Sequence, residues 1–327
     1  MAILRFQGRE YGCRSGETVL ECLERHGLSP PSSCRSGVCQ TCLMRAESGE
    51  VPETAQKGLK DTLRARGYFL ACVCKPRADM AVALADDQAA HRQGATVVGK
   101  ESLADGIVRL RLLPASPLAY HAGQFVNLIR DDGLVRSYSL ASLPEADGAE
   151  LEFHVRHVPG GQMSGWICED LEPGMTLTVE GPLGDCYYLP GAPDTPLLLV
   201  GTGTGLAPLW GILRDALARG HEAPIHLYHG SYEAGGLYLV ESLRALDAAH
   251  DNFHYTPCVD EGDENAGFAI GRADRQAMAA HPDLKGWRVY LCGHPRMVET
   301  MKRQAFLAGA SLGDIYADPF VYSVPTG

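Results

Sequence analysis

Three cysteines in a nine-residue stretch constrain the fold of the N-terminal part more than any other feature of this chain. Cys34, Cys39 and Cys42 have the spacing C-x4-C-x2-C, which is typical of loops that bind a 2Fe–2S cluster through cysteine thiolates. Such a loop needs Gly37, where the backbone has to approach the cluster closely, and free N–H groups that donate to the sulfur atoms. Zinc fits less well, because zinc sites usually take two C-x2-C units and this region contains one.

The fourth ligand has to come from elsewhere in the chain, and the segment Leu70-Ala-Cys72-Val-Cys74 offers two candidates. Cys72 lies thirty positions after Cys42. Residues i and i+2 share one face of a strand, so the pattern by itself does not choose between Cys72 and Cys74. The cysteines without any partner spacing are interpreted as small core hydrophobes; they are Cys13, Cys22, Cys168, Cys186 and Cys258.

Composition and charge exclude several classes of function. The 327 residues suffice for two or three domains and carry a net charge of −11. Residues 1–87 hold 12 basic and 11 acidic side chains, whereas residues 88–327 hold 17 and 29. Neither part has the dense basic surface of a nucleic-acid-binding protein. No segment approaches the ~20 apolar residues of a membrane span, and the N-terminus lacks the apolar stretch of a signal peptide, so we expect a cytoplasmic protein.

The pattern of apolar residues and turn signals predicts three domains. A helix is expected from Thr18 to His26 among short strands in residues 1–87, and the polar segment 86–95 is interpreted as a linker. Short alternating runs then predict an antiparallel barrel in residues 96–192. Its expected strands are Thr96–Gly99, Ile107–Leu113, Gln124–Ile129, Val135–Leu140, Glu150–His157 and Thr176–Glu180, with one helix at Met163–Leu171.

Strands alternate with helices in residues 193–327, which predicts a parallel sheet with right-handed crossovers. The expected strands are Leu197–Val200, Ile225–His229, Phe253–Val259 and Arg288–Cys292, and the expected helices are Leu206–Arg219, Leu237–Ala249, Arg272–Ala280 and Pro295–Ala308.

Two segments of the predicted barrel suit a flavin dinucleotide. Arg136-Ser-Tyr138-Ser139 offers a cation for a pyrophosphate, an aromatic side chain for a flat ring system and a hydroxyl for a ring nitrogen. The run from His154 to Ser164 places two glycines and a serine before a helix, where unpaired N–H groups and the helix dipole attract phosphate. For this second segment taken alone, an ordinary turn with Ser164 as a helix cap is the alternative.

A glycine-rich turn, Gly201-Thr-Gly-Thr-Gly205-Leu-Ala-Pro208, follows a predicted buried strand and opens a helix. Dinucleotide phosphates bind at this place in doubly wound sheets, although the spacing differs from the usual G-x-G-x-x-G. The segment Leu291-Cys292-Gly293-His-Pro295-Arg-Met297 repeats this geometry at the end of another strand, beside the same crevice. On residue type alone, Cys292 fits a buried structural cysteine more often than a site residue.

Together, these motifs resemble the ferredoxin-containing reductases of bacterial oxygenases, in the ferredoxin–NADP reductase superfamily, over nearly the whole chain. The resemblance rests on the Cys34–Cys42 loop with Leu70-Ala-Cys72, Arg136–Ser139, His154–Ser164, Glu180–Gly184, Gly201–Pro208, Leu291–Met297 and the tail Ile315–Phe320. It implies a multidomain α+β and α/β fold: a β-grasp 2Fe–2S ferredoxin domain in 1–87, an antiparallel β-barrel FAD domain in 96–192, and a doubly wound parallel-sheet NAD domain in 193–327.

The resemblance also implies roles for single residues in the flavin site. Arg136 and Ser164 would bind the FAD pyrophosphate, Tyr138 would pack on the isoalloxazine, and Ser139 would contact its N5 edge. The set assigned to cofactor binding is Arg136, Ser137, Tyr138, Ser139, His154, Val155, Arg156, Gly160, Gly161, Gln162, Met163, Ser164, Gly201, Thr202, Gly203, Thr204, Gly205, Glu233, Cys292, Gly293, Pro295 and Phe320.

Three of these residues are the candidate catalytic ones. Beside Ser139, Cys292 would face the nicotinamide, and Phe320 would cover the flavin until the nicotinamide displaces it. In the cluster loop, the family places its fourth ligand directly after Leu-Ala, which favours Cys72. The implied metal ligands are therefore Cys34, Cys39, Cys42 and Cys72.

Two departures from the family pattern concern the coenzyme. Where the family commonly shows Gly-x-Arg and then Asp-Leu-Tyr, this chain has Gly230-Ser-Tyr232 and Gly236-Leu-Tyr238. The absence of arginine at position 232 removes a partner for a 2′-phosphate, and Glu233 would repel one. We therefore expect NADH rather than NADPH, with Arg296 as the residue through which NADPH could still bind.

The expected activity is that of an NAD(P)H-dependent oxidoreductase. FAD would accept a hydride and pass single electrons to the cluster, and from there to a terminal oxygenase or hydroxylase, or to a separate acceptor protein. Delivery to a dehydratase of deoxysugar synthesis and a flavin-free iron–sulfur sensor or regulatory subunit are the alternatives. We expect a monomer that binds neither nucleic acid nor membrane. The near-neutral charge around the cluster, with Arg35 and Arg45, predicts docking that depends weakly on ionic strength, or a partner with an acidic patch.

Overall fold

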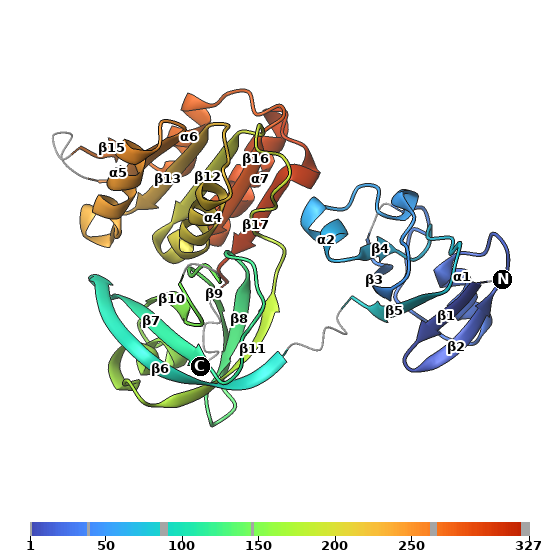
Figure 1. Cartoon of the computed structure of the whole chain (residues 1–327). Helices are drawn as coiled ribbons and strands as arrows, with labels where there is room; N and C mark the ends of the chain where they lie inside the picture. Colours follow the sequence, from blue (N-terminus) through green and yellow to red (C-terminus); the bar gives the residue numbers. More distant parts are fainter. Residues whose placement is uncertain (1, 38–39, 86–90, 145–146, 262–266, 322–327) are drawn as a thin grey trace. The chain divides into compact units, whose positions relative to one another are not determined.

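The computed structural model describes residues 2–37, 40–85, 91–144, 147–261 and 267–321, and Figure 1 labels its elements. The chain divides into two compact units, Met1–Ala89 and Ala90–Gly327, which are described separately. Within the described residues, none of the helices is long and apolar enough to cross a membrane. The three domain boundaries drawn from the sequence stay predictions.

The first unit is a five-stranded sheet of the β-grasp type in the order β2-β1-β5-β3-β4. Its β1–β5 pair is parallel and the other pairs are antiparallel. Helix α1 begins after Thr18 because Thr18 Oγ1 accepts from the N–H of Glu21, whose carboxylate accepts from the N–H of Thr18. The elements are β1 (Ala2–Phe6), β2 (Arg9–Cys13), α1 (Val19–Arg25), β3 (Leu43–Ser48), α2 (Asp61–Ala65), β4 (Tyr68–Leu70) and β5 (Met80–Leu84).

The second unit contains an antiparallel sheet of six strands in the order β10-β7-β6-β11-β8-β9. Its outer strands meet where the N–H of Ala141 donates to the carbonyl of Glu152 at 2.9 Å. The sheet thus curls around an apolar core that includes Leu110, Leu128 and Phe153, as predicted. The strands are β6 (His91–Ala104), β7 (Ile107–Pro114), β8 (Phe125–Ile129), β9 (Val135–Ser139), β10 (Leu151–Arg156) and β11 (Thr176–Leu183).

Two expectations within this barrel are corrected. Residues 91–95, assigned to the linker, form the start of β6, because their backbone pairs with β11 although their side chains show no apolar alternation. The helix expected over Met163–Leu171 is shorter: α3 (Gln162–Gly165) gives way to a π-helical turn at Trp166–Asp170. In that turn the N–H of Leu171 donates to the carbonyl of Trp166, five residues earlier.

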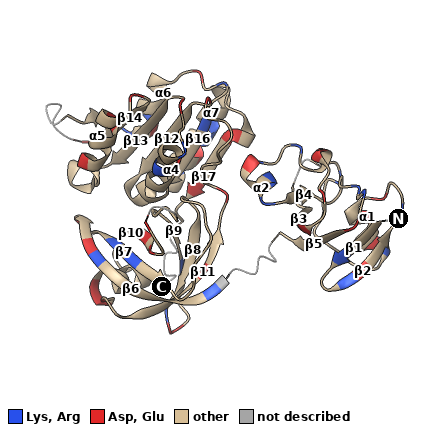
Figure 2. Ribbon diagram, in the orientation of Figure 1, with Lys and Arg blue, Asp and Glu red and all other residues tan. Residues whose placement is uncertain are grey.

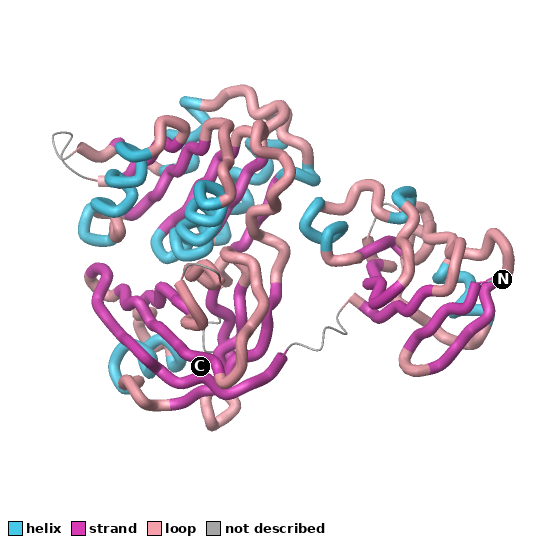
Figure 3. Tube along the Cα trace, in the orientation of Figure 1, coloured by secondary structure: helices cyan, strands magenta, loops and turns pink. Residues whose placement is uncertain are grey.

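The rest of the second unit is a six-stranded parallel sheet in the order β15-β14-β13-β12-β16-β17. Leu197 and Leu199 of β12 pack with α4 and α5, whereas Leu198 and Val200 pack with α6 and α7, so helices cover both faces (Figure 3). The doubly wound fold is confirmed. Its elements are β12 (Leu197–Thr202), α4 (Leu206–Ala218), β13 (Ile225–Ser231), α5 (Val240–Ala249), β14 (Phe253–Val259), β15 (Ala269–Ile270), α6 (Ala273–Ala280), β16 (Arg288–Gly293), α7 (Pro295–Leu307) and β17 (Ile315–Pro319).

Strand β12 is the point at which the strand order reverses, since β13 lies on one side of it and β16 on the other. In open sheets of this kind, ligands bind in the crevice outside the carboxyl ends of the strands at such a switch point. Helix α4, which follows β12, also contacts the barrel: Arg214 donates to both carboxylate oxygens of Asp147 at 2.9 and 2.6 Å. The barrel and the parallel sheet are therefore joined through α4.

Candidate cofactor sites

Cysteine sulfurs gather at one end of the first unit. Cys42 precedes β3 and Cys72 follows β4, and the N–H of Ala71 donates to the carbonyl of Cys42 at 3.0 Å. The thiols of Cys42 and Cys72 are in hydrogen-bond contact, and burial raises the pKa of the Cys42 thiol to about 11. Cys34 is exposed on the same loop, and Cys39 lies outside the described residues.

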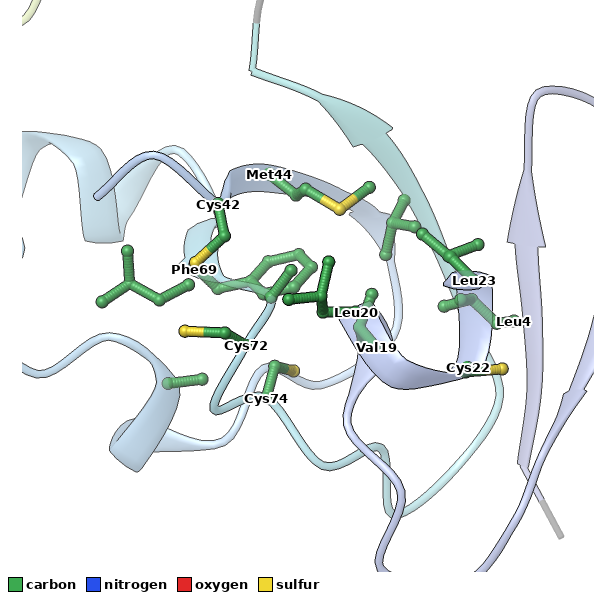
Figure 4. Packing of buried hydrophobic residues seen from close by; sticks show 14 of the residues in the cluster. Leu4, Val19, Leu20, Cys22, Leu23, Cys42, Met44, Phe69, Cys72 and Cys74 are labelled. Atoms are coloured by element: carbon green, nitrogen blue, oxygen red, sulfur yellow. The ribbon is translucent and has the colours of Figure 1, made fainter. Parts of the chain in front are cut away.

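Cys72 and Cys74 point in different directions. In Figure 4 the sulfurs of Cys72 and Cys42 lie on the same side, whereas the sulfur of Cys74 points away from them, toward Val19 of α1. The strand face expected for Cys72 and Cys74 does not form, because β4 ends at Leu70 and the N–H of Cys74 turns back to the carbonyl of Leu70 at 3.1 Å. Cys74 is fully buried, and burial raises the pKa of its thiol to about 12.

The cysteine loop is tightly wound. Arg35, Gly37 and Gln40 have left-handed backbone conformations with φ of 55°, 76° and 60°. The N–H of Ser36 donates to the sulfur of Cys34 at 3.5 Å. A Cβ on Gly37 would lie 3.3 Å from both methyl carbons of Val73, so glycine lets the loop approach the turn that carries Cys72. These features fit a loop wrapped around a small cluster.

A cavity of about 710 Å³ lies where the barrel meets the parallel sheet, within the range of about 300–1,000 Å³ that cofactor sites occupy. The predicted residues that line it are Arg136, Ser137, Tyr138, Ser139, His154, Arg156, Gly160, Gly161, Gln162, Met163, Ser164, Thr204 and Phe320. The lining residues that sequence reasoning missed are Phe125, Val135, Val158, Ala207, Asp318, Pro319 and Val321. Val155, by contrast, points into the barrel core, because neighbouring residues of a strand face opposite sides.

The turn before α3 forms one wall of this cavity. Gly160 has a φ of +73°, and a Cβ on Gly161 would lie 2.5 Å from Ser164 Oγ and 2.9 Å from the carbonyl oxygen of Val158. The hydroxyl of Ser164 accepts from the N–H of Val158 at 3.1 Å, which folds the turn over the start of the helix. The first N–H groups of a helix have no intrahelical partner, so this wall suits an anion.

Two arginines bring positive charge to the cavity. The guanidinium of Arg136 donates to the neighbouring carbonyl of Val135 at 2.7 Å and forms no ion pair with any residue that the structure describes. Arg156, at the end of β10, reaches the glycine-rich turn: a Cβ on Gly203 would lie 3.0 Å from its Nη2. Both guanidinium groups can therefore compensate phosphate charge.

A serine and an aspartate meet in the cavity wall although 179 positions separate them. Ser139 Oγ donates to Asp318 Oδ2 at 3.0 Å. Burial is the main cause that raises the pKa of the Asp318 carboxyl to about 6; the charge of Asp185 acts in the same direction, and the hydrogen bond from Ser139 opposes it. A carboxyl group that titrates near neutrality can hold or release a proton at this place.

His154 lies in the buried part of the wall. Its Nε2 is 2.9 Å from the carboxylate of Glu152, and its Nδ1 is 3.1 Å from the hydroxyl of Tyr238. Burial lowers the pKa of His154, so the ring is neutral at pH 7. Since the carboxylate can only accept, Nε2 carries the proton and the Tyr238 hydroxyl donates to Nδ1. This string of hydrogen bonds joins β10 of the barrel to the segment before α5.

The two turns at the switch point are in direct contact. A Cβ on Gly205 would lie 2.2 Å from the carbonyl oxygen of Cys292, and a Cβ on Gly293, whose φ is +115°, would lie 2.5 Å from the carbonyl oxygen of Thr202. Thr202 Oγ1 accepts from the N–H of His294 at 3.0 Å. Only glycine allows the two strand ends to approach this closely.

The remaining predicted residues take different places. The sulfur of Cys292 is fully buried 3.9 Å from the sulfur of Cys186, and Cys292 is not among the residues that line the cavity; its contact with a nicotinamide stays a prediction. Phe320 lines the cavity, and its N–H donates to the carbonyl of Gly293 at 2.8 Å. Gly201 pairs with Cys292 across β12 and β16, Pro295 begins α7, and Glu233 is exposed before a short 3-10 helix at Ala234–Gly236.

Three family models match successive parts of the chain. Residues 4–77 match the 2Fe-2S iron-sulfur cluster binding domain, residues 95–188 the oxidoreductase FAD-binding domain, and residues 199–303 the oxidoreductase NAD-binding domain.

Relatives match along most of the chain. It is 38% identical over 305 residues to the reductase subunit of an aromatic O-demethylase from Amycolatopsis sp., which covers 89% of this chain and 90% of the relative. It is 36% identical over 311 residues to the ferredoxin–NAD(P)(+) reductase component of a naphthalene 1,2-dioxygenase system from Pseudomonas putida, which covers 94% of each. The crystal structure of an Amycolatopsis cytochrome P450 reductase matches 98% of this chain and 99% of that one, with 35% identity and a TM-score of 0.68.

The fold and the sites define an iron–sulfur flavoprotein oxidoreductase with 2Fe–2S, FAD-binding and NAD-binding domains. The chain belongs to the family of ferredoxin–NAD(P)⁺ reductase components of oxygenase systems.

Proposed function

We propose that this protein takes electrons from NADH and passes them through FAD and a 2Fe–2S cluster to the terminal oxygenase or hydroxylase of a multicomponent system. The observation that carries the proposal is a cofactor-sized cavity lined by residues of both the barrel and the parallel sheet, in a chain that also holds the cysteine loop. FAD, when bound, would accept a hydride and release single electrons to the cluster. Relatives named as reductase components of dioxygenase and O-demethylase systems support an oxygenase as the acceptor.

Four cysteines would hold the cluster: Cys34, Cys39, Cys42 and Cys72. The contact between the thiols of Cys42 and Cys72 supports this set, and the direction of the Cys74 sulfur argues against its participation.

In the cavity, Arg136 and the turn that ends at Ser164 would bind the pyrophosphate, and Tyr138 would pack on the isoalloxazine. The hydroxyl of Ser139 would orient the N5 edge, with Asp318 holding a proton behind it. Phe320, anchored through its N–H, would shield the flavin from water until the nicotinamide arrives.

Anaerobic titration of the purified protein with NADH tests this function. NADH donates two electrons, whereas flavin accepts two and the cluster accepts one. Bleaching of both chromophores should therefore be complete at about 1.5 equivalents of NADH per protein. Purified protein without flavin absorbance, or a cluster that stays oxidised in excess NADH, would contradict the proposal.

The coenzyme preference rests on the end of β13. Tyr232 is exposed there, its hydroxyl is hydrogen-bonded to Glu261, and the carboxylates of Glu233 and Asp260 lie nearby. A 2′-phosphate placed among these carboxylates would be repelled by their negative charge, whereas a ribose 2′-hydroxyl could donate a hydrogen bond to one of them. We therefore expect kcat/KM for NADH to exceed that for NADPH. The double substitution Tyr232→Arg with Glu233→Gln should lower the ratio of kcat/KM for NADH to kcat/KM for NADPH. Equal kcat/KM values for the two coenzymes in the wild type would refute the preference.

A further inference from the structure

The residues around the cluster loop carry an excess of positive charge. Residues 34–77 hold eight basic and four acidic side chains, a net charge of +4, whereas residues 88–327 have a net charge of −12. Residues 1–33 are neutral, with four basic and four acidic side chains, and the three aspartates in residues 78–87 bring residues 1–87 to a net charge of +1. Figure 2 marks the charged residues on the ribbon.

Three of these cations are compensated by ion pairs, namely Arg35 with Glu24, Arg45 with Glu47 and Arg64 with Asp61. Lys57, Lys75 and Arg77 are exposed and form no ion pair with any residue in the described ranges. Lys57, Lys75 and Arg77 therefore present positive charge at the surface of the segment.

Two of these cations, Lys57 and Lys75, lie beside the cysteine loop. The side-chain amide of Gln40 donates to the carbonyl of Gly58 at 3.3 Å, which holds the residue after Lys57 against the loop. Lys75 directly follows the turn that carries Cys72 and Cys74. Cys34 is the exposed ligand of this loop, so an electron acceptor that approaches it meets these cations.

We propose that this face, with Lys57 and Lys75 beside the exposed Cys34, docks an acceptor protein whose own redox centre lies under an acidic surface. The proposal rests on the proposed function, because the acceptor is the partner that receives electrons from the cluster. Complementary charges steer association, raise its rate by about 10- to 1,000-fold and lose this effect as salt is added. Of the two docking modes that the sequence allows, the placement of the cations selects the acidic partner.

Two soluble haem proteins of opposite surface charge serve as probes: an acidic cytochrome b5 and a lysine-rich cytochrome c. Reoxidation of the reduced cluster is followed by stopped flow at increasing ionic strength. With cytochrome b5, the second-order rate constant should fall by about tenfold between roughly 20 and 300 mM salt. With cytochrome c it should stay constant or rise. The proposal is overturned if the rate constant with cytochrome b5 does not depend on ionic strength, or if the rate constant with cytochrome c falls steeply as salt is added.

Charge reversal locates the surface. Lys57→Glu should lower the rate with cytochrome b5 roughly fivefold at low salt, whereas Arg9→Glu is the matched control, with the same charge change at an exposed position of β2, on the far edge of the sheet from β3 and β4. Equal effects of the two substitutions overturn the proposal. Dithionite, used in stoichiometric amount, reduces the cluster without NADH, and the docking test can then be repeated. A failure of NADH to reduce the cluster would therefore count against the proposed function alone.

Discussion

Gly205 fills the contact between the glycine-rich turn and the end of β16, and its replacement by alanine tests the architecture of the switch point. A Cβ there would lie 2.2 Å from the carbonyl oxygen of Cys292, 2.5 Å from its carbonyl carbon and 2.8 Å from the Cα of Gly293. All three are backbone atoms, so no side chain can rotate away. Ordinary van der Waals contact begins at 3.4 Å, so Gly205→Ala has to separate the two segments by roughly 1 Å, an overpacking that costs ~1–3 kcal/mol.

The same displacement should weaken coenzyme binding. The turn is the proposed site of the coenzyme pyrophosphate, and one lost charge-assisted hydrogen bond costs about 1.5–3 kcal/mol, or roughly 10- to 150-fold in the Kd for NADH. For a loss of ~2 kcal/mol, the melting temperature should fall by about 4–8 °C. Coenzyme titration and thermal unfolding measure the two effects.

Gly313→Ala is the control, because a Cβ there would meet only Ser311 Oγ at 3.6 Å. If Gly205→Ala binds NADH and melts as Gly313→Ala does, the packing argument is refuted.

Two further predictions concern buried hydrogen bonds of the cavity wall. Because folding raises the pKa of the Asp318 carboxyl from 3.8 to about 6, the folded protein binds this proton more tightly than the unfolded chain, and stability falls as the pH rises through 6. Asp318→Asn should therefore raise the free energy of unfolding by ~1–3 kcal/mol over the wild type at about pH 8, and by less at about pH 5. Urea unfolding at the two pH values measures this difference, and a difference independent of pH would contradict the prediction. Tyr238→Phe should lower the free energy of unfolding by ~1–3 kcal/mol, because it leaves His154 Nδ1 buried without a donor. A double-mutant cycle with His154→Phe should show a coupling energy above about 0.5 kcal/mol. Additive losses in the two single variants would exclude the hydrogen bond.

The elements that could be predicted from the sequence are those whose own residues show a clear apolar pattern. Strand β14 occupies the expected residues Phe253–Val259, and α7 begins at Pro295 as expected. Strand β17 was not expected, because Ile315–Pro319 is short and contains an aspartate, and only pairing with β16 makes it a strand. The start of β6 was not predicted for the same reason: residues 91–95 form a strand because their backbone pairs with β11, and their sequence shows no apolar alternation.

Site residues within one contiguous motif were predictable, and all residues from Arg136 to Ser139 and from Gly160 to Ser164 line the cavity. Asp318 lies in the tail that carried the resemblance, but its contact with Ser139 depends on how the parallel sheet meets the barrel. Local spacing contains no information on such a contact. The Cys72–Cys74 ambiguity arose because the sequence suggested a strand where the chain makes a turn.

The central claim is that electrons leave through a cluster held by Cys34, Cys39, Cys42 and Cys72. The most direct test is the low-temperature EPR signal of the reduced cluster after addition of NADH to the wild type, Cys72→Ser and Cys74→Ser. We expect the signal in the wild type and in Cys74→Ser, and its loss in Cys72→Ser with flavin still reduced by NADH. A signal retained in Cys72→Ser and lost in Cys74→Ser would show that the fourth ligand is misassigned, and flavin reduction without any cluster signal in the wild type would refute the electron path.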